Sequence, residues 1–215
     1  MAADRTLLGI VGSVSDSSKT ATAVETALEA AAERDGVTTE TLRLSDHDLV
    51  TADGRTLDAY EGDTAAALEA IVEADAYVVG TPIYRGSLSG ALKNLFDMVP
   101  RGMWQADVAP FEDAAVGLVA TGATNHHYLA IDQELRPIFG FFGAHTVGGS
   151  VYATDDHFES LADGGDGTDD AGGAGGYAVA DDALGERLAD LGRATVELDA
   201  ALADADALTG LGPQF

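Results

Sequence analysis

The sequence predicts a doubly wound α/β fold, in which five parallel strands form a sheet covered by helices on both faces. Apolar runs of strand length, such as Ala76–Val79 and Ala114–Ala120, alternate along the chain with amphipathic helical segments. Three of these strands are followed by polar loops that lead into helices. Because ligands bind beyond the carboxyl ends of parallel strands, we expect the functional site to lie on these loops.

The first half of the chain contains two β–α units. The first strand is apolar throughout, as in a parallel sheet buried on both faces, and the Ala-rich helix after it ends at Asp35-Gly36. In order, we expect a strand at 6–11, a helix ending near 34, a strand at 37–44, a polar loop at 45–61 with short helical turns, and a helix at 65–73 that begins at Asp63-Thr64.

The second half continues the alternation and ends in a long amphipathic helix. Leucines recur at helical spacing after Asp181, and the segment before it consists mainly of Gly and Asp with little to bury. We expect a strand at 76–79, a helix from 91 to about 99, a strand at 114–120, a helix at 128–142, a strand at 146–152, a flexible acidic Gly-rich segment at 163–183 and a closing helix at about 183–208.

Length and composition indicate one domain, residues 1–215, with a sizeable core. No apolar run reaches the length of a membrane span, and the first twenty residues lack the pattern of a signal peptide, so we expect a cytoplasmic protein. The chain contains no cysteine, which excludes disulfides, thiol catalysis and cysteine-ligated metals.

The formal net charge is −26, from 37 acidic and 11 basic residues. Such a field repels nucleic acid and anionic membranes. The acidic residues are spread along the chain, which favours a solvated acidic shell of the kind found in salt-loaded cytoplasm over a single acidic surface for a partner.

An acidic shell predicts that the fold depends on salt, because salt screens the repulsion between the carboxylates. We expect the melting temperature, followed by circular dichroism, to be lower in dilute buffer than in molar KCl. Identical melting curves in the two buffers would refute the salt-adapted interpretation.

The first loop, Gly12 to Thr20, places hydroxyl and amide donors at the start of a helix, together with Lys19, one of only two lysines. Helix dipole, donors and cation all favour a bound phosphate. Ser13 and Ser18 replace the glycines of a nucleoside triphosphate loop, and no dinucleotide glycine motif is present. Simple helix capping by serine is the alternative.

The second loop, Thr81 to Ser87, offers an aromatic side chain and a series of backbone amides. Tyr84 could stack against a flat ring, while the amides around Arg85–Ser87 could donate to ring carbonyls and stabilise negative charge. The alternative is a β-turn with a surface tyrosine. The other lysine, Lys93, either serves this site or is a solvated helix residue.

Two other classes of site find little support. His126 and His127 are adjacent, so their side chains point in different directions, and no carboxylate spacing around them fits zinc. The sequence has no nucleophile elbow or Ser-His-Asp order, which argues against a hydrolase.

With these loops, the chain resembles the NADPH-dependent FMN reductase family of flavodoxin-like proteins, and within it the sulfonate-assimilation FMN reductases, over roughly Leu7 to Ala153. The resemblance implies a flavodoxin-like sheet in the order 2-1-3-4-5. The segments that support it are the Ser-rich first loop, Gly80-Thr81-Pro82-Ile83-Tyr84-Arg85-Gly86-Ser87, Ser89-Gly90-Ala91-Leu92-Lys93, and Ala120-Thr121-Gly122-Ala123-Thr124 through His127 to Asp132 and Arg136-Pro137.

The resemblance implies an FMN cofactor, NADPH or NADH as donor, and hydride transfer from the nicotinamide to flavin N5, with no protein acid or base required. The acceptor would be a flavin, a quinone or an azo compound. It implies FMN contacts for Ser13, Ser15, Ser18, Lys19 and Thr20 at the phosphate, for Pro82, Ile83, Tyr84, Arg85, Gly86 and Ser87 at the ring, and for Thr121 and Gly122 at the ring's border.

The chain departs from the family at three places, one of which is the acidic Gly-rich segment from Asp163, which has no clear counterpart. Many members carry an arginine near Ser15, so here Lys19 would supply the positive charge. Some two-component members carry an aromatic residue at the position of Gln133, which leaves open whether reduced flavin passes to a partner monooxygenase or stays bound for another acceptor.

Two further classes of function are alternatives to a reductase. A flavodoxin-like carrier would exchange electrons with protein partners without a nicotinamide, and an acidic surface would suit such docking. A non-enzymatic scaffold would make the three loops coincidental. The family also implies a homodimer or homotetramer, for which the apolar residues Leu95, Phe96, Met98, Val99 and Trp104 are either an interface or internal core.

Overall fold

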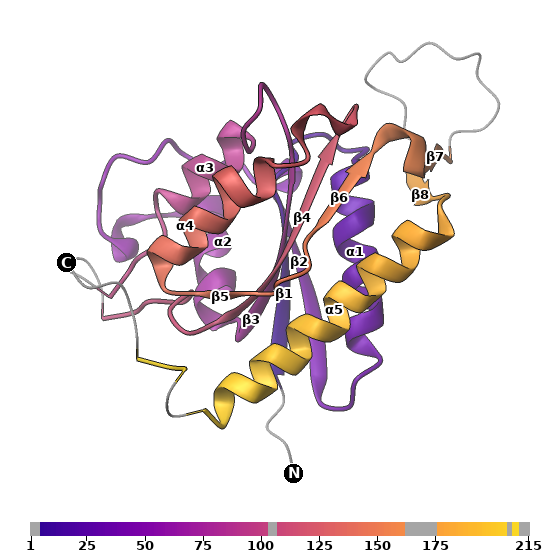
Figure 1. The fold of residues 1–215 in the computed structure, drawn as a ribbon. Helices are drawn as coiled ribbons and strands as arrows, with labels where there is room; N and C mark the ends of the chain where they lie inside the picture. Colours follow the sequence, from indigo (N-terminus) through magenta and orange to yellow (C-terminus); the bar gives the residue numbers. More distant parts are fainter. Residues whose placement is uncertain (1–4, 103–106, 162–175, 206–207, 211–215) are drawn as a thin grey trace.

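A computed structural model describes residues 5–102, 107–161, 176–205 and 208–210. Its main sheet is parallel with the order β2-β1-β3-β4-β5, and β6 also pairs with β4 (Figure 1). The predicted fold class and strand order are therefore confirmed. The strands are β1 (Arg5–Val11), β2 (Val37–Arg43), β3 (Ala76–Pro82), β4 (Ala115–Gly122), β5 (His145–Thr146) and β6 (Val151–Thr154).

Helices cover both faces of this sheet, and each face has its own apolar core. On one face lie α1 (Lys19–Ala32) and α5 (Asp182–Ala203); on the other lie α2 (Gly62–Glu73), α3 (Gly90–Phe96) and α4 (Arg136–Phe142) (Figure 1). This two-sided burial explains why β1, β3 and β4 are apolar on both faces. No described helix is long and apolar enough to cross a membrane.

The apolar residues after α3 belong to one of these cores. Leu95, Phe96, Met98 and Val99 are at most 7% exposed and pack with Phe111 and Phe139, whose rings meet that of Phe96 edge to face. Of the two alternatives for these four residues, the structure therefore supports the internal core. Trp104 and Met103 lie outside the described residues.

The expected strand at 146–152 differs in the structure. It is divided into β5, which pairs with the beginning of β4, and β6, which pairs with the end of β4. The interruption falls at Gly148-Gly149, and glycine has a low preference for strands. Arg136 stabilises the chain next to this interruption by donating to Thr146 Oγ1 at 2.7 Å and to the carbonyl oxygen of Val147 at 3.2 Å.

The expected helix at 128–142 is also irregular. A 3₁₀ turn at Asn125–His127 and a π-helical turn at Ile131–Leu135 precede α4. Pro137 has no amide hydrogen to donate to the preceding turn, which is a physical reason for the wider turn before it.

Short regular elements occur in the segments at 45–61 and 163–183. Short 3₁₀ turns occur at Leu44–Asp46 and Leu57–Ala59, as expected. In the second segment, β8 (Tyr177–Val179) pairs antiparallel with β7 (Phe158–Ser160), so this stretch differs from the expected flexible excursion because Tyr and Val favour strands. Residues 162–175 lie outside the described residues.

The closing helix begins at Asp182, close to its predicted start, and ends at Ala203, before its predicted end near 208. Asp181 caps it by accepting a hydrogen bond from the amide of Leu184 at 2.7 Å. Near its end, the buried carboxylate of Asp199 is paired with Arg5, whose Nε lies 2.8 Å from Asp199 Oδ2. The last helix is thereby fastened to the first strand.

Candidate functional site

The loops after β1, β3 and β4 meet at one edge of the sheet. Ser89 Oγ donates to the carbonyl oxygen of Gly12 at 2.6 Å, which joins the first loop to the second. The hydroxyls of Thr20 and Thr121 lie 2.6 Å apart, and the amide of Ile83 donates to the carbonyl oxygen of Thr121 at 2.8 Å. The structure therefore brings together the three loops that the sequence singled out.

The first loop ends in a well-formed helix N-terminus. Ser18 is the N-cap of α1, and its side chain accepts from the amide of Ala21 at 3.2 Å. The amides of Lys19 and Thr20 lie in the first turn, where an α-helix has no carbonyl partner for them. These donors and the helix dipole together favour an anion beside Ser18.

Two hydroxyl residues of this loop are buried. Ser13 is 5% exposed and its Oγ accepts from the amide of Ser15 at 3.3 Å, and Thr20 is 2% exposed with its hydroxyl bonded to Thr121. Their side chains fix the shape of the loop. Ser15, Ser18 and Lys19 are more exposed and lie where a ligand could reach them.

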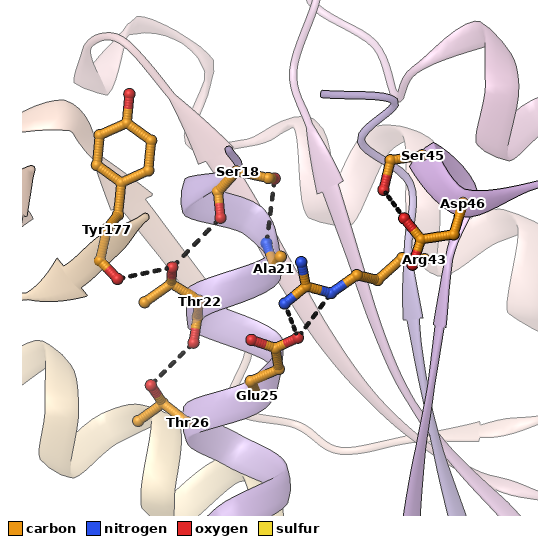
Figure 2. A network of polar contacts seen from close by, with 9 residues as sticks. All are labelled: Ser18, Ala21, Thr22, Glu25, Thr26, Arg43, Ser45, Asp46 and Tyr177. Carbon is orange, nitrogen blue, oxygen red and sulfur yellow. Dashed lines mark hydrogen bonds and ion pairs between the residues drawn. The ribbon is translucent and has the colours of Figure 1, made fainter. Parts of the chain in front are cut away.

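Lys19 forms an ion pair and a cation–π contact with two residues that the sequence did not indicate. Its Nζ lies 2.8 Å from Asp155 Oδ1, just after β6, and 5.0 Å from the ring centroid of Tyr177 on β8. Figure 2 shows a further link, because Thr22 Oγ1 donates to the carbonyl oxygen of Tyr177 at 3.2 Å. The start of α1 is thus held by the β7–β8 hairpin and the turn before it.

The second loop forms a tight two-residue turn. Tyr84 and Ser87 exchange backbone hydrogen bonds of 2.9 and 3.2 Å, and Arg85 and Gly86 have positive φ angles of 56° and 87°. Glycine suits this conformation, whereas Arg85 adopts it at some cost in strain. The amides of Arg85 and Gly86 are not part of that pair of bonds, and the Tyr84 side chain is 55% exposed.

The π-helical turn supports this loop from the side. Glu134 accepts a hydrogen bond from Ser87 Oγ at 2.8 Å. His127 lies near the same turn, since a Cβ built on Gly86 would be 4.0 Å from His127 Nδ1. Glu134 carries no sequence signal of its own, because the irregular π turn determines which loop it reaches.

The third loop, Thr121 to His127 after β4, is covered by Tyr152 of β6. Its hydroxyl donates to the carbonyl oxygen of Thr124 at 2.7 Å, and a Cβ on Gly122 would lie 2.2 Å from that hydroxyl oxygen. Burial, together with the charge of Asp155, raises the pKa of Tyr152. Gly122 is therefore required for this close approach.

The first of the two adjacent histidines in this loop contacts a hydroxyl group. His126 Nδ1 lies 2.9 Å from Thr124 Oγ1. Within the part of the chain that the structure describes, no group of three or more His, Cys, Asp or Glu side chains is placed to hold a metal ion.

The chemical groups at this site match those that FMN would require. One end offers a helix N-terminus, hydroxyls and a lysine, which suit a phosphate dianion. The other offers an exposed tyrosine and two amides of a tight turn, which suit a flat ring with carbonyl oxygens.

Comparison with known proteins decides the family. Residues 5–159 match the family model of the NADPH-dependent FMN reductases. The chain belongs to the NADPH-dependent FMN reductase family. Membership confirms the predicted oxidoreductase class, with FMN and NAD(P)H as the cofactors that this family uses.

Curated relatives support this family assignment. A NAD(P)H-dependent FAD/FMN reductase of Geobacillus thermodenitrificans is 42% identical over 154 residues, which cover 71% of this chain and 78% of the relative. The NADH-dependent FMN reductase SfnF of Pseudomonas putida is 42% identical over 104 residues, which cover 46% of this chain and 52% of SfnF. The alignment with SfnF thus spans about half of that protein.

Solved structures show the same fold. The apo form of the NADH:FMN oxidoreductase EMOB has a TM-score of 0.67 and 24% identity, with 98% of this chain and 97% of that chain covered. FerB from Paracoccus denitrificans, a flavoenzyme NAD(P)H:(acceptor) oxidoreductase, has a TM-score of 0.66 and 17% identity, covering 92% and 98%. Flavodoxin-like architecture therefore extends beyond the segment that matches the FMN reductase family.

Proposed function

We propose that this protein binds FMN across the three loops and transfers a hydride to it from NADPH or NADH. The observation that carries the proposal is the joining of the loops by the Ser89–Gly12 and Thr20–Thr121 hydrogen bonds at the carboxyl edge of β1, β3 and β4. The family match supports the same chemistry.

Each loop has a separate task in this proposal. Ser15 and Ser18, with the first amides of α1, bind the phosphate beside Lys19, while Ser13 and Thr20 fix the loop. Pro82, Ile83, Tyr84, Arg85, Gly86 and Ser87 border the ring, and Thr121 and Gly122 close its other side.

When bound, FMN supplies the hydride acceptor at N5. The amides of Arg85 and Gly86 would donate to the ring's polar edge and so stabilise negative charge on it. Glu134 would hold these amides in place through Ser87. The nicotinamide needs an open face of the ring, which the exposed Tyr84 borders.

Steady-state oxidation of the donor tests the proposal. We expect the purified protein to oxidise NADPH or NADH in a reaction that requires added FMN, with the preferred donor identified by the ratio of kcat/KM values. Binding of FMN without any donor oxidation would favour the flavodoxin-like carrier instead.

We also propose that reduced flavin leaves the protein and can serve a partner monooxygenase. The similarity to SfnF, an NADH-dependent FMN reductase by name, supports this route over a tightly held cofactor that reduces quinones or azo compounds. Anaerobic filtration after reduction is expected to recover reduced FMN in the filtrate. Flavin retained on the protein would point to the other acceptors.

We propose a cytoplasmic homodimer or homotetramer. Support comes from exposed apolar side chains around the third loop and α4, namely Tyr128, Leu129 and Phe141, which are 60%, 44% and 51% exposed. Cytoplasm is where reduced nicotinamides are available. Light scattering is expected to give a multiple of the 22.0 kDa chain mass, and the mass of one chain would refute the oligomer.

A further inference from the structure

Lys19 is the basic side chain on the first turn of α1, and it is paired with a carboxylate. The 2.8 Å ion pair with Asp155 is only partly exposed on the lysine side, where the side chain is 26% accessible, and 51% exposed on the carboxylate side. The charge that would attract a phosphate to this loop is therefore largely balanced within the protein.

Tyr177 of β8 also helps to fix the position of Lys19. The face of the Tyr177 ring lies 5.0 Å from Lys19 Nζ, within the range of a cation–π contact. Thr22, one turn along α1, is bonded to the carbonyl oxygen of Tyr177, as Figure 2 shows. The ammonium group thus lies between the turn after β6 and the β7–β8 hairpin.

We propose that Asp155 is a positioning residue that weakens FMN binding by holding the Lys19 ammonium away from the phosphate. This inference rests on the proposed function. The phosphate then binds chiefly to hydroxyls and helix amides, and the carboxylate of Asp155 adds repulsion. Such a site releases flavin readily, as a protein that exchanges FMN as a substrate requires.

The test is the dissociation constant of oxidised FMN in molar KCl, measured by flavin fluorescence for wild type and Asp155→Asn. A partly exposed ion pair is worth up to about 1 kcal/mol, and molar salt screens part of it, so we expect Asp155→Asn to bind FMN about threefold more tightly. Riboflavin, which lacks the phosphate, should bind both proteins equally.

Two control variants separate the ion pair from the general effect of charge. Asp156→Asn removes the same charge from the neighbouring exposed residue, and it should change FMN affinity much less. In a Lys19→Gln background, Asp155→Asn should increase FMN affinity no more than Asp156→Asn does. Should Asp155→Asn fold poorly in a melting experiment, Asp155→Ser replaces it.

The outcomes distinguish this inference from the proposed function. Wild-type protein that fails to bind FMN would refute the proposed function itself. Wild-type binding with unchanged affinity in Asp155→Asn would overturn only the role of Asp155. Weaker FMN binding in Asp155→Asn would also overturn it, because Asp155 would then orient Lys19 towards the phosphate.

Discussion

Replacing Ser18 with Asp is expected to abolish most of the FMN affinity while leaving α1 intact. Asp is as good an N-cap as Ser, so its carboxylate can still accept from the amide of Ala21. The same carboxylate would face the FMN phosphate. Like charges about 4 Å apart repel by about 1 kcal/mol in water and about 4 kcal/mol near a protein surface, so we expect roughly a hundredfold loss of affinity.

The matched control for this change is Ser18→Asn, which has nearly the same shape and capping ability without the charge. It should retain FMN affinity far better than Ser18→Asp, and both variants should melt close to wild type. Riboflavin should bind all three proteins alike. Unchanged FMN affinity in Ser18→Asp would refute the proposal that the FMN phosphate binds at the start of α1.

The second large effect concerns the contact between α1 and α5. Gly192 lies against α1 so closely that a Cβ there would be 1.9 Å from the carbonyl oxygen of Ala27. Because that atom belongs to the backbone, Gly192→Ala must push the two helices apart and disturb the core beneath them, which includes Val24 and Leu191. We expect a loss of about 3 kcal/mol in the free energy of unfolding, as in severe overpacking.

Gly185→Ala on the same helix is the matched control. Its Cβ would meet only Val179 Cγ1 at 3.9 Å, an ordinary contact, and alanine favours a helix over glycine by about 1 kcal/mol. Denaturant unfolding should therefore show Gly192→Ala strongly destabilised and Gly185→Ala equal to or above wild type. Equal stabilities for the two variants would refute this close packing.

Much of the fold was predictable because its signals are local. The apolar runs at β1, β3 and β4 and the Gly- and Ser-containing loops after them indicate buried parallel strands that end at a ligand site. Irregular elements were less predictable. At the Gly148-Gly149 break a strand is interrupted, and at the π turn before Pro137 a helix changes its number of residues per turn. Both changes occur within a few residues, so the hydrophobic periodicity of the sequence does not reveal them.

The meeting of the three loops was predictable from the sequence, but the residues that support these loops were not. Glu134 and Asp155 reach Ser87 and Lys19 from segments 47 and 136 positions away in the sequence, and no pattern links them. The role of Thr20 also differs from simple ligand binding, since its hydroxyl bonds to Thr121 inside the protein. Such long-range pairs depend on tertiary structure, which periodicity and motif spacing do not specify.

The most direct test of the account is an anaerobic absorbance titration in molar KCl, in which NADPH or NADH is added to the protein with bound FMN. We expect at least one donor to bleach the oxidised flavin band in proportion to the donor added. FMN that binds without being bleached by either donor would contradict hydride transfer and favour an electron carrier. Protein that binds no FMN would contradict the assignment of the site itself.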